Sequence, residues 1–469
     1  MDRPQGASYP ARPFVLGTLA LTLLLGLLRL LGFVARFHHG SLQMDFSAFY
    51  TAGQAVNAGQ SPYLTNVALR IWDGVDGYLH SRFLYPPLVA TLFQPVAALP
   101  YGTAKLVWMG ISLAALAVAI LAVLDFVPRR WRLEAGLAAG VAAAFFYPLL
   151  TLLERGQMDT VTMAFMAIGV RWIRAPGGRT RVGAGIMFAL ATLLKLNVAF
   201  VFPYLLLRRS WRAAAGFAVG GLILLLVSLA LNGPAPVLDY VHHQMPRIER
   251  YGEGGPGAGL SAGQVRVLQA GAPRGETRKD GQVYPLAYFG FSANATLVRL
   301  RVVQRRFRTA RTPSALSRRL LEWSLVPMGL LEVLLAFRRV TLRDPEILAY
   351  WTAVFTIVLL TGPFSWVMNV VWLTLVPVVI FAQAAKLRSP WQGLCLAVCA
   401  VGFVWAAVPD SGAFGMLNPF RGRHAQLLTG DLKYIIAAVA VLVGLVAMLA
   451  CAPGGRGRTE GAAMGEGGR

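Results

Sequence analysis

The chain has 469 residues, of which 56% are hydrophobic and only 14% are charged. This balance excludes an ordinary soluble globular domain and places most of the chain in lipid. A formal net charge of +23 would suggest nucleic acid as a partner, but the arginines lie mainly in short clusters between apolar stretches. Membrane topology explains such clusters better. The sequence therefore predicts an all-α polytopic membrane protein whose partners include membrane lipids and no nucleic acid.

The first predicted membrane helix runs from Phe14 to Val34. It is about as long as the bilayer core requires, exceeds the apolar core of a signal peptide and has no clear cleavage site after it. We therefore expect it to be retained. Arg29 lies near its outer end, where the side chain either snorkels to the headgroups or pairs with Asp45 or a lipid phosphate.

The loop that follows the first helix opens with an acid. Aromatic residues at helical spacing, Phe46, Phe49 and Tyr50, predict a short interfacial helix with Asp45 at its N-cap or in its first turn. The simpler interpretation is that Asp45 only caps this helix. The alternative is that its carboxylate, at the membrane surface, acts as a general base.

Further apolar stretches follow along the chain, at 103–125, 134–153, 158–173, 183–207, 213–231, 320–336, 345–361, 366–385, 391–408 and 432–451. Together with the first helix they predict about 11 to 13 transmembrane helices. Basic clusters alternate with them, and the positive-inside rule places these clusters and both termini in the cytoplasm. We expect one transmembrane domain over residues 1–451, external loops at 35–86 and 232–319, and a disordered cytoplasmic tail at 452–469.

Two apolar regions are interrupted on the predicted external side, at 154–159 and at Lys195-Leu196-Asn197. The basic clusters all fall on the cytoplasmic side of the membrane only if residues 183–207 cross it twice, and this stretch is too short for two full helices. We therefore expect a bent or broken pair whose junction faces a protein-lined cavity. The segment 87–98 between prolines is equally short and is expected to dip into the membrane without crossing it.

Polar residues at these interruptions are the candidates for chemistry. An ionisable residue inside an apolar run, such as Lys195, is a functional hypothesis by default, and the helix N-terminus beside it favours an anion such as phosphate. Snorkelling to the headgroups explains Lys195 equally well. Gln157 and Asp159 either line the same cavity or satisfy the backbone of their short turn.

A third group, Asn294, Arg299 and Arg301, follows an aromatic stretch at 288–292. Arginines beside aromatic residues suit a phosphate or a sugar phosphate, and they suit anionic lipid headgroups equally. The chain contains no HExxH, CxxC, Walker or GxSxG pattern, which argues against zincin, ATPase and hydrolase chemistry. We expect no metal site.

Several of these blocks occur in an order that resembles glycosyltransferase family 87. The blocks are Asp45 with Tyr50 and Pro62-Tyr63, then Tyr85-Pro86-Pro87, Gly156-Gln157 with Asp159, Leu194-Lys195, Asn294 before Arg299, and Pro363-Phe364-Ser365-Trp366 ahead of Trp372. The likeness covers residues from about 45 to 385, and it depends on the order and spacing of the blocks rather than on any single one.

The resemblance implies a GT-C-like bundle with short re-entrant or interfacial helices on the external side. It implies inverting transfer of a sugar, most often mannose, from a polyprenyl-phosphate sugar to a hydroxyl of a glycolipid or glycan acceptor outside the cell, with no cofactor. By position, Asp45 is the catalytic base, and Lys195, Arg299 and Arg301 are expected to bind the donor phosphate. The expected substrate-binding residues are Tyr50, Tyr85, Gln157, Asp159, Asn294, Trp366 and Asn369.

One departure from the family concerns the segment after Ser365-Trp366. Members of the family commonly carry one or two histidines there, whereas this chain has Val367-Met368-Asn369. An asparagine can hydrogen-bond a sugar but cannot shuttle a proton near neutral pH. Two alternatives therefore stand beside the transferase: a secondary transporter of a small anionic or lipid-linked substrate, and a catalytically idle lipid-binding relative.

Overall fold

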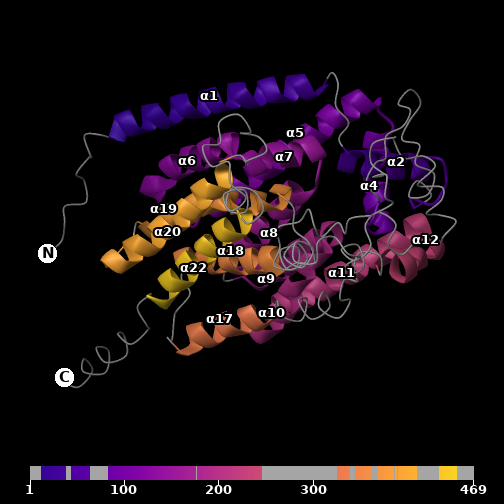
Figure 1. Cartoon of the computed structure of the whole chain (residues 1–469). Coiled ribbons are helices and arrows are strands. Elements are labelled where there is room, and N and C mark those ends of the chain that lie inside the picture. The colour runs from indigo at the N-terminus through magenta and orange to yellow at the C-terminus, as the bar shows by residue number, and fades with distance from the viewer. Residues whose placement is uncertain are drawn as a thin grey trace, which may run out of the picture.

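The computed structural model describes residues 12–38, 44–63, 83–175, 177–245, 325–337, 344–361, 367–384, 386–387, 389–408 and 433–451. Every regular element in these ranges is a helix, so the all-α prediction is confirmed (Figure 1). The amino-terminal helices are α1 (Arg12–His38), α2 (Met44–Asn57), α4 (Pro87–Ala97), α5 (Tyr101–Leu124), η1 (Arg129–Trp131), α6 (Arg132–Phe145), α7 (Tyr147–Arg155) and α8 (Asp159–Ile173).

The remaining helices continue the bundle. They are α9 (Gly178–Leu194), η2 (Leu196–Phe200), α10 (Val201–Leu207), α11 (Trp211–Asn232), α12 (Pro234–Asp239), η3 (Tyr240–Gln244), α17 (Leu325–Phe337), α18 (Asp344–Thr361), η6 (Val367–Leu375), α19 (Val376–Ala384), α20 (Pro390–Ala407) and α22 (Lys433–Ala450). In the whole set of elements, η1, η2 and η6 are 3-10 helices, and η3 is a π-helix.

Five of the described helices, α1, α5, α11, α20 and α22, are long and apolar enough to cross a membrane. The pair η1–α6 and α7 adds a sixth span if its two parts, bent by 59°, are counted together. The chain is therefore a multi-pass membrane protein, as predicted. The finer count of about 11 to 13 spans also included shorter apolar segments. That count stays a prediction.

The bend between α6 and α7 was not anticipated, because residues 134–153 look like one apolar run. Pro148 explains it, since a proline has no N–H to donate to the carbonyl four residues earlier and its ring crowds that carbonyl. Phe146 takes an extended conformation at the bend. The carbonyl of Ala144 instead accepts a hydrogen bond from Nη1 of Arg29 at 3.0 Å, so this arginine meets a helix end rather than Asp45.

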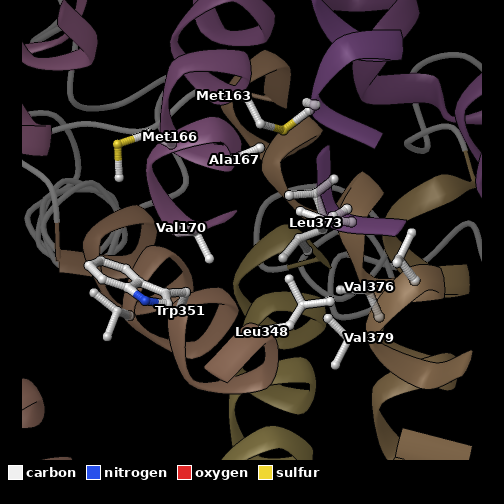
Figure 2. Close-up of a cluster of buried hydrophobic side chains, with 14 of the residues drawn as sticks. Met163, Met166, Ala167, Val170, Leu348, Trp351, Leu373, Val376 and Val379 are labelled. Carbon is white, nitrogen blue, oxygen red and sulfur yellow. The ribbon is translucent and has the colours of Figure 1, made fainter. Parts of the chain in front are cut away.

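The centre of the bundle is an apolar core where α8, α18 and the η6–α19 segment meet. Figure 2 shows these side chains pointing toward one another, and its labelled residues are Met163, Met166, Ala167, Val170, Leu348, Trp351, Leu373, Val376 and Val379. All nine are almost completely buried. Dense packing of this kind fixes the ends of α8 and η6 relative to each other, and both elements carry polar residues of the candidate site.

Several basic clusters gather at one end of the bundle. Arg171, at the end of α8, pairs with Asp125, at the end of α5, at 2.6 Å, and Arg132 at the start of α6 pairs with the same carboxylate at 3.3 Å. Arg12, which begins α1, donates to the carbonyl of Arg130 at 2.8 Å. We call this the basic end of the molecule.

The opposite end of the bundle carries the interrupted segments. Helix α5 has 24 residues and is therefore about 36 Å long, so its first residue lies far from the basic end. Helix α8 packs against α5 and also has its last turn at the basic end, so α8 begins at the far end. In Figure 1, α2, α4 and α12 gather on the right, away from α19 and α20 on the left.

Candidate active site

Asp45 lies in the first turn of α2, as predicted, and its side chain is buried, with 7% of the residue exposed. Nε2 of Gln157 donates to Oδ2 of Asp45 at 2.9 Å. The hydroxyl of Tyr85 in turn donates to Oε1 of Gln157 at 3.3 Å. The structure thus brings together three residues that the sequence placed in one site, although they lie in different segments of the chain.

The packing of α2 differs from the expected one-sided interfacial helix. Its first turns are buried on all sides, and Ser47, Ala48 and Thr51 are as inaccessible as Phe46 and Phe49. The reason is that α4, α5 and the segment at 83–86 wrap around it with an aromatic cluster. The helix itself and the position of Asp45 are confirmed, but the helix is a core element of the end that carries the interrupted segments.

Tyr50 holds α2 against the turn between α4 and α5. Its hydroxyl donates to the carbonyl of Leu99 at 2.7 Å, and its ring packs edge-on against Tyr101 with centroids 5.2 Å apart. Burial raises the pKa of Tyr50 above its ordinary value, which keeps the hydroxyl protonated as a donor. In this arrangement Tyr50 fixes the position of the helix that carries Asp45.

The turn that carries Gln157 is tightly held. Helix α7 ends at Arg155, and Gly156 follows in the left-handed conformation with φ of 75°, which a residue with a Cβ adopts only with strain. Nε1 of Trp108 donates to the carbonyl of Gly156 at 2.8 Å. The predicted interruption at 154–159 is therefore confirmed, and Gln157 projects from it toward Asp45.

Asp159, which begins α8, is completely buried and collects donors from two other parts of the chain. Lys195 forms an ion pair with its Oδ1. Asn369 donates to both carboxylate oxygens at 3.1 Å, and Nε1 of Trp372 donates to Oδ1 at 2.8 Å. We call these four residues the Asp159 cluster.

Lys195 lies where the predicted broken pair divides. Helix α9 ends at Leu194, Lys195 adopts an extended conformation, and the chain continues as η2 and α10, which confirms the break. The side chain of Lys195 is 18% exposed. Because the ammonium of Lys195 pairs with Asp159, its charge is balanced, and this lowers the attraction of Lys195 for a phosphate. The ammonium still has further N–H groups for hydrogen bonding.

Sequence reasoning assigned no site role to three residues of this region. Trp108 and Trp372 are indole donors in apolar helices, and such donors find a partner when they are buried. Lys105 is 3% exposed on the first turns of α5, with Nζ 5.9 Å from the ring centroid of Tyr101. An ionisable residue in an apolar run was the signal that should have pointed to Lys105, as it did to Lys195.

Four predicted site residues, Asn294, Arg299, Arg301 and Trp366, lie outside the described residues. Within the described ranges, no three His, Cys, Asp or Glu side chains lie close enough together to hold a metal ion. The expectation that the reaction needs no metal stays a prediction.

Comparison with known proteins identifies the family. The family model for glycosyltransferase family 87 matches residues 83–321, just over half of the chain. A curated relative, the polyprenol-phosphate-mannose-dependent alpha-(1-2)-phosphatidylinositol mannoside mannosyltransferase of Mycobacterium tuberculosis, is 31% identical over 212 residues, which is 41% of this chain and 48% of the relative.

The chain thus matches about half the length of that curated relative. The segment matched by the family model contains Tyr85, Gln157, Asp159 and Lys195, while Asp45 and Asn369 lie outside it and join the site through contacts in space. A multi-pass bundle with a buried carboxylate network at its interrupted end agrees with this match, and the chain belongs to glycosyltransferase family 87.

Proposed function

We propose that the protein is a membrane glycosyltransferase that transfers mannose from polyprenyl-phosphate mannose to a hydroxyl of a glycolipid or glycan acceptor. Membership of the family and the activity for which the mycobacterial relative is named support the donor and the acceptor class. The observation that carries the proposal is the contact between Gln157 and Asp45 at 2.9 Å. It joins the family-matched segment to an acid in a separate helix.

Asp45 acts as the general base in this proposal. Gln157 donates its hydrogen bond to Oδ2 of Asp45. Within the described residues Oδ1 makes no hydrogen bond, so Oδ1 is available to accept the proton of an acceptor hydroxyl. The acceptor oxygen then bonds to the anomeric carbon from the face opposite the phosphate. The bond between this carbon and the phosphate oxygen breaks, its electron pair stays on the phosphate, and the sugar is transferred with inversion.

Negative charge that develops on the departing lipid phosphate requires hydrogen-bond donors or cations. Lys195 supplies one donor group, since it lies at the chain break directly after the end of α9 and retains N–H groups beyond the one that contacts Asp159. Arg299 and Arg301 are proposed for the same role. A phosphate held in this way is a good leaving group, so the chemistry requires neither a nucleotide site nor a metal.

The reaction is proposed to occur on the external face of the membrane, with both termini in the cytoplasm. The ion pairs of Asp125 with Arg132 and Arg171 gather the basic residues at one end of the bundle, and the positive-inside rule assigns that end to the cytoplasm. The first residues of α5 and α8 lie at the other end, together with Asp45 and Gln157. This arrangement supports an external site.

The direct test is sugar transfer from synthetic polyprenyl-phosphate mannose, measured with purified protein in lipid vesicles and a panel of glycolipid and glycan acceptors. Asp45→Asn keeps the shape of the side chain but removes the base, and transfer should fall roughly 100-fold or more. Asp239→Asn is the matched control, because this carboxylate lies in α12, bonds His243 and Gln244, and should leave transfer unchanged. Absence of transfer by the unaltered protein with every donor would favour a transporter or a lipid-binding relative.

A further inference from the structure

The two carboxylates of the external end have opposite surroundings. Asp45 accepts one hydrogen bond among the described residues, whereas Asp159 receives four contacts from three side chains. We propose that Asp159 is a positioning residue, which holds Gln157 and Lys195 in place for sugar transfer and does not touch the sugar itself. This inference rests on the proposed function, and it assigns a different role to a residue that the family resemblance placed among the substrate contacts.

Burial excludes Asp159 from direct contact with the sugar. The residue is 0% exposed. Three of its four contacts, from Lys195, Asn369 and Trp372, converge on Oδ1, and the fourth joins Asn369 to Oδ2. A sugar hydroxyl could reach Asp159 only if the side chains that cover it moved aside.

The contacts of Asp159 join three places where the chain leaves the α-helical conformation. Asp159 itself follows the turn at Gly156, Lys195 lies at the break between α9 and η2, and the other two donors lie in η6. The 3-10 conformation of η6 places these two donors on one side of the segment. Residues three apart lie on the same side of a 3-10 helix, so Asn369 and Trp372 both reach one carboxylate. In an α-helix they would diverge by about 60°.

Asp159 reaches Asp45 through a short, fixed turn. The carbonyl of Gly156 is held by Trp108 on one side of Gln157, and Asp159 is held by its cluster on the other side. Gln157 lies between these two anchors and has little freedom to move relative to Asp45. The same carboxylate holds the ammonium of Lys195, so one buried group sets the position of both the residue beside the base and the donor for the phosphate.

A purely structural role would also make Asp159 sensitive to mutation, because removing one partner of a buried ion pair leaves an uncompensated charge. The positioning role makes a narrower claim, which is that part of the effect on turnover passes through Gln157. A double-mutant cycle on kcat measures this coupling. We expect Asp159→Asn alone to lower kcat at least 10-fold, and to lower it several-fold less in a Gln157→Ala background, where only its effect through Lys195 remains. Independent, multiplicative losses would overturn the inference.

Tyr350→Phe is the matched control for stability. It removes a buried hydroxyl that donates to Glu332 in a polar cluster of α17 and α18, away from Asp45. We expect it to lower thermal stability without changing kcat. A loss of kcat in proportion to the loss of stability, in both Tyr350→Phe and Asp159→Asn, would show that folding alone explains the effect and would overturn the positioning role.

A readout that does not require activity separates this inference from the proposed function. The amides of Gly156 and Gln157 donate to the carbonyl of Leu152, and their hydrogen exchange reports how firmly the turn is held. Exchange at these amides should accelerate in Asp159→Asn and in the milder Trp372→Phe, which removes only the indole N–H from the cluster. Unchanged exchange in both variants would overturn the positioning role. Accelerated exchange in a protein that transfers no sugar would overturn the function and retain Asp159 as the anchor of the turn.

Discussion

The ammonium of Lys195 pairs with the carboxylate of Asp159 across 36 residues of sequence. The pair connects two interruptions of the apolar sequence, and Gln157, two residues before Asp159, connects the same turn to Asp45. The residues proposed to carry the chemistry therefore form one continuous polar network inside an otherwise apolar bundle. Each link in this network can be broken separately.

Replacing Lys195 tests its role toward the donor phosphate. Lys195→Met removes the ammonium and keeps most of the apolar stem, so the KM for polyprenyl-phosphate mannose should rise roughly 10- to 100-fold, the usual value of a hydrogen bond to a charged group. The KM for the acceptor should change little. Steady-state kinetics with each substrate varied in turn measures both, and Lys195→Arg should recover part of the donor affinity. Equal donor KM in Lys195→Met and the unaltered protein would refute this assignment.

Placing a second carboxylate beside Asp45 tests the base. Gln157→Glu introduces an acid within hydrogen-bonding distance of Oδ2, and two neighbouring carboxylates tend to share a proton because their charges repel. A base that holds a proton is inactive, so activity should be lost at acidic pH and should recover only as the pH rises. The acid limb of the pH profile of kcat/KM should move upward relative to the unaltered protein. Gln157→Leu removes only a hydrogen bond to the carboxylate and adds no charge, so it should lower activity and move that limb less than Gln157→Glu does.

The sequence predicted the parts of the site that depend on local pattern. Charged or polar residues that interrupt apolar runs located the breaks at 154–159 and Lys195, and aromatic spacing located the helix that begins near Asp45. Contacts between distant segments were not predictable in this way. Asn369 reaches Asp159 across 210 residues, and the mostly apolar residues around Asn369 do not distinguish the 3-10 helix that carries it from an α-helix.

Arg29 is predicted to stabilise the bend between α6 and α7. Arg29→Met removes the donor to the carbonyl of Ala144 and should cost about 1–2 kcal/mol of stability. The loss should be smaller in a Pro148→Ala background, since an alanine N–H can donate to that carbonyl in place of the guanidinium. Thermal unfolding of the four proteins in the same detergent measures the coupling. Equal losses in both backgrounds would show that Arg29 acts in another way.

The close packing of α9 against α11 is predicted to fix the position of Lys195 in the site. Helices α9 and α11 approach so closely that a Cβ on Gly185 would overlap the backbone of Ala213, and one on Gly216 would overlap that of Val182. Gly185→Ala should therefore push the helices apart and cost about 1–3 kcal/mol of stability. Because α9 ends next to Lys195, the displacement should also raise the KM for the lipid-linked donor. Gly221→Ala is the matched control on α11, where a Cβ meets open space, and it should leave the donor KM unchanged and the unfolding temperature unchanged or slightly higher, because alanine favours a helix more than glycine does. Similar losses in the two variants would show that the contact between α9 and α11 does not govern the position of Lys195.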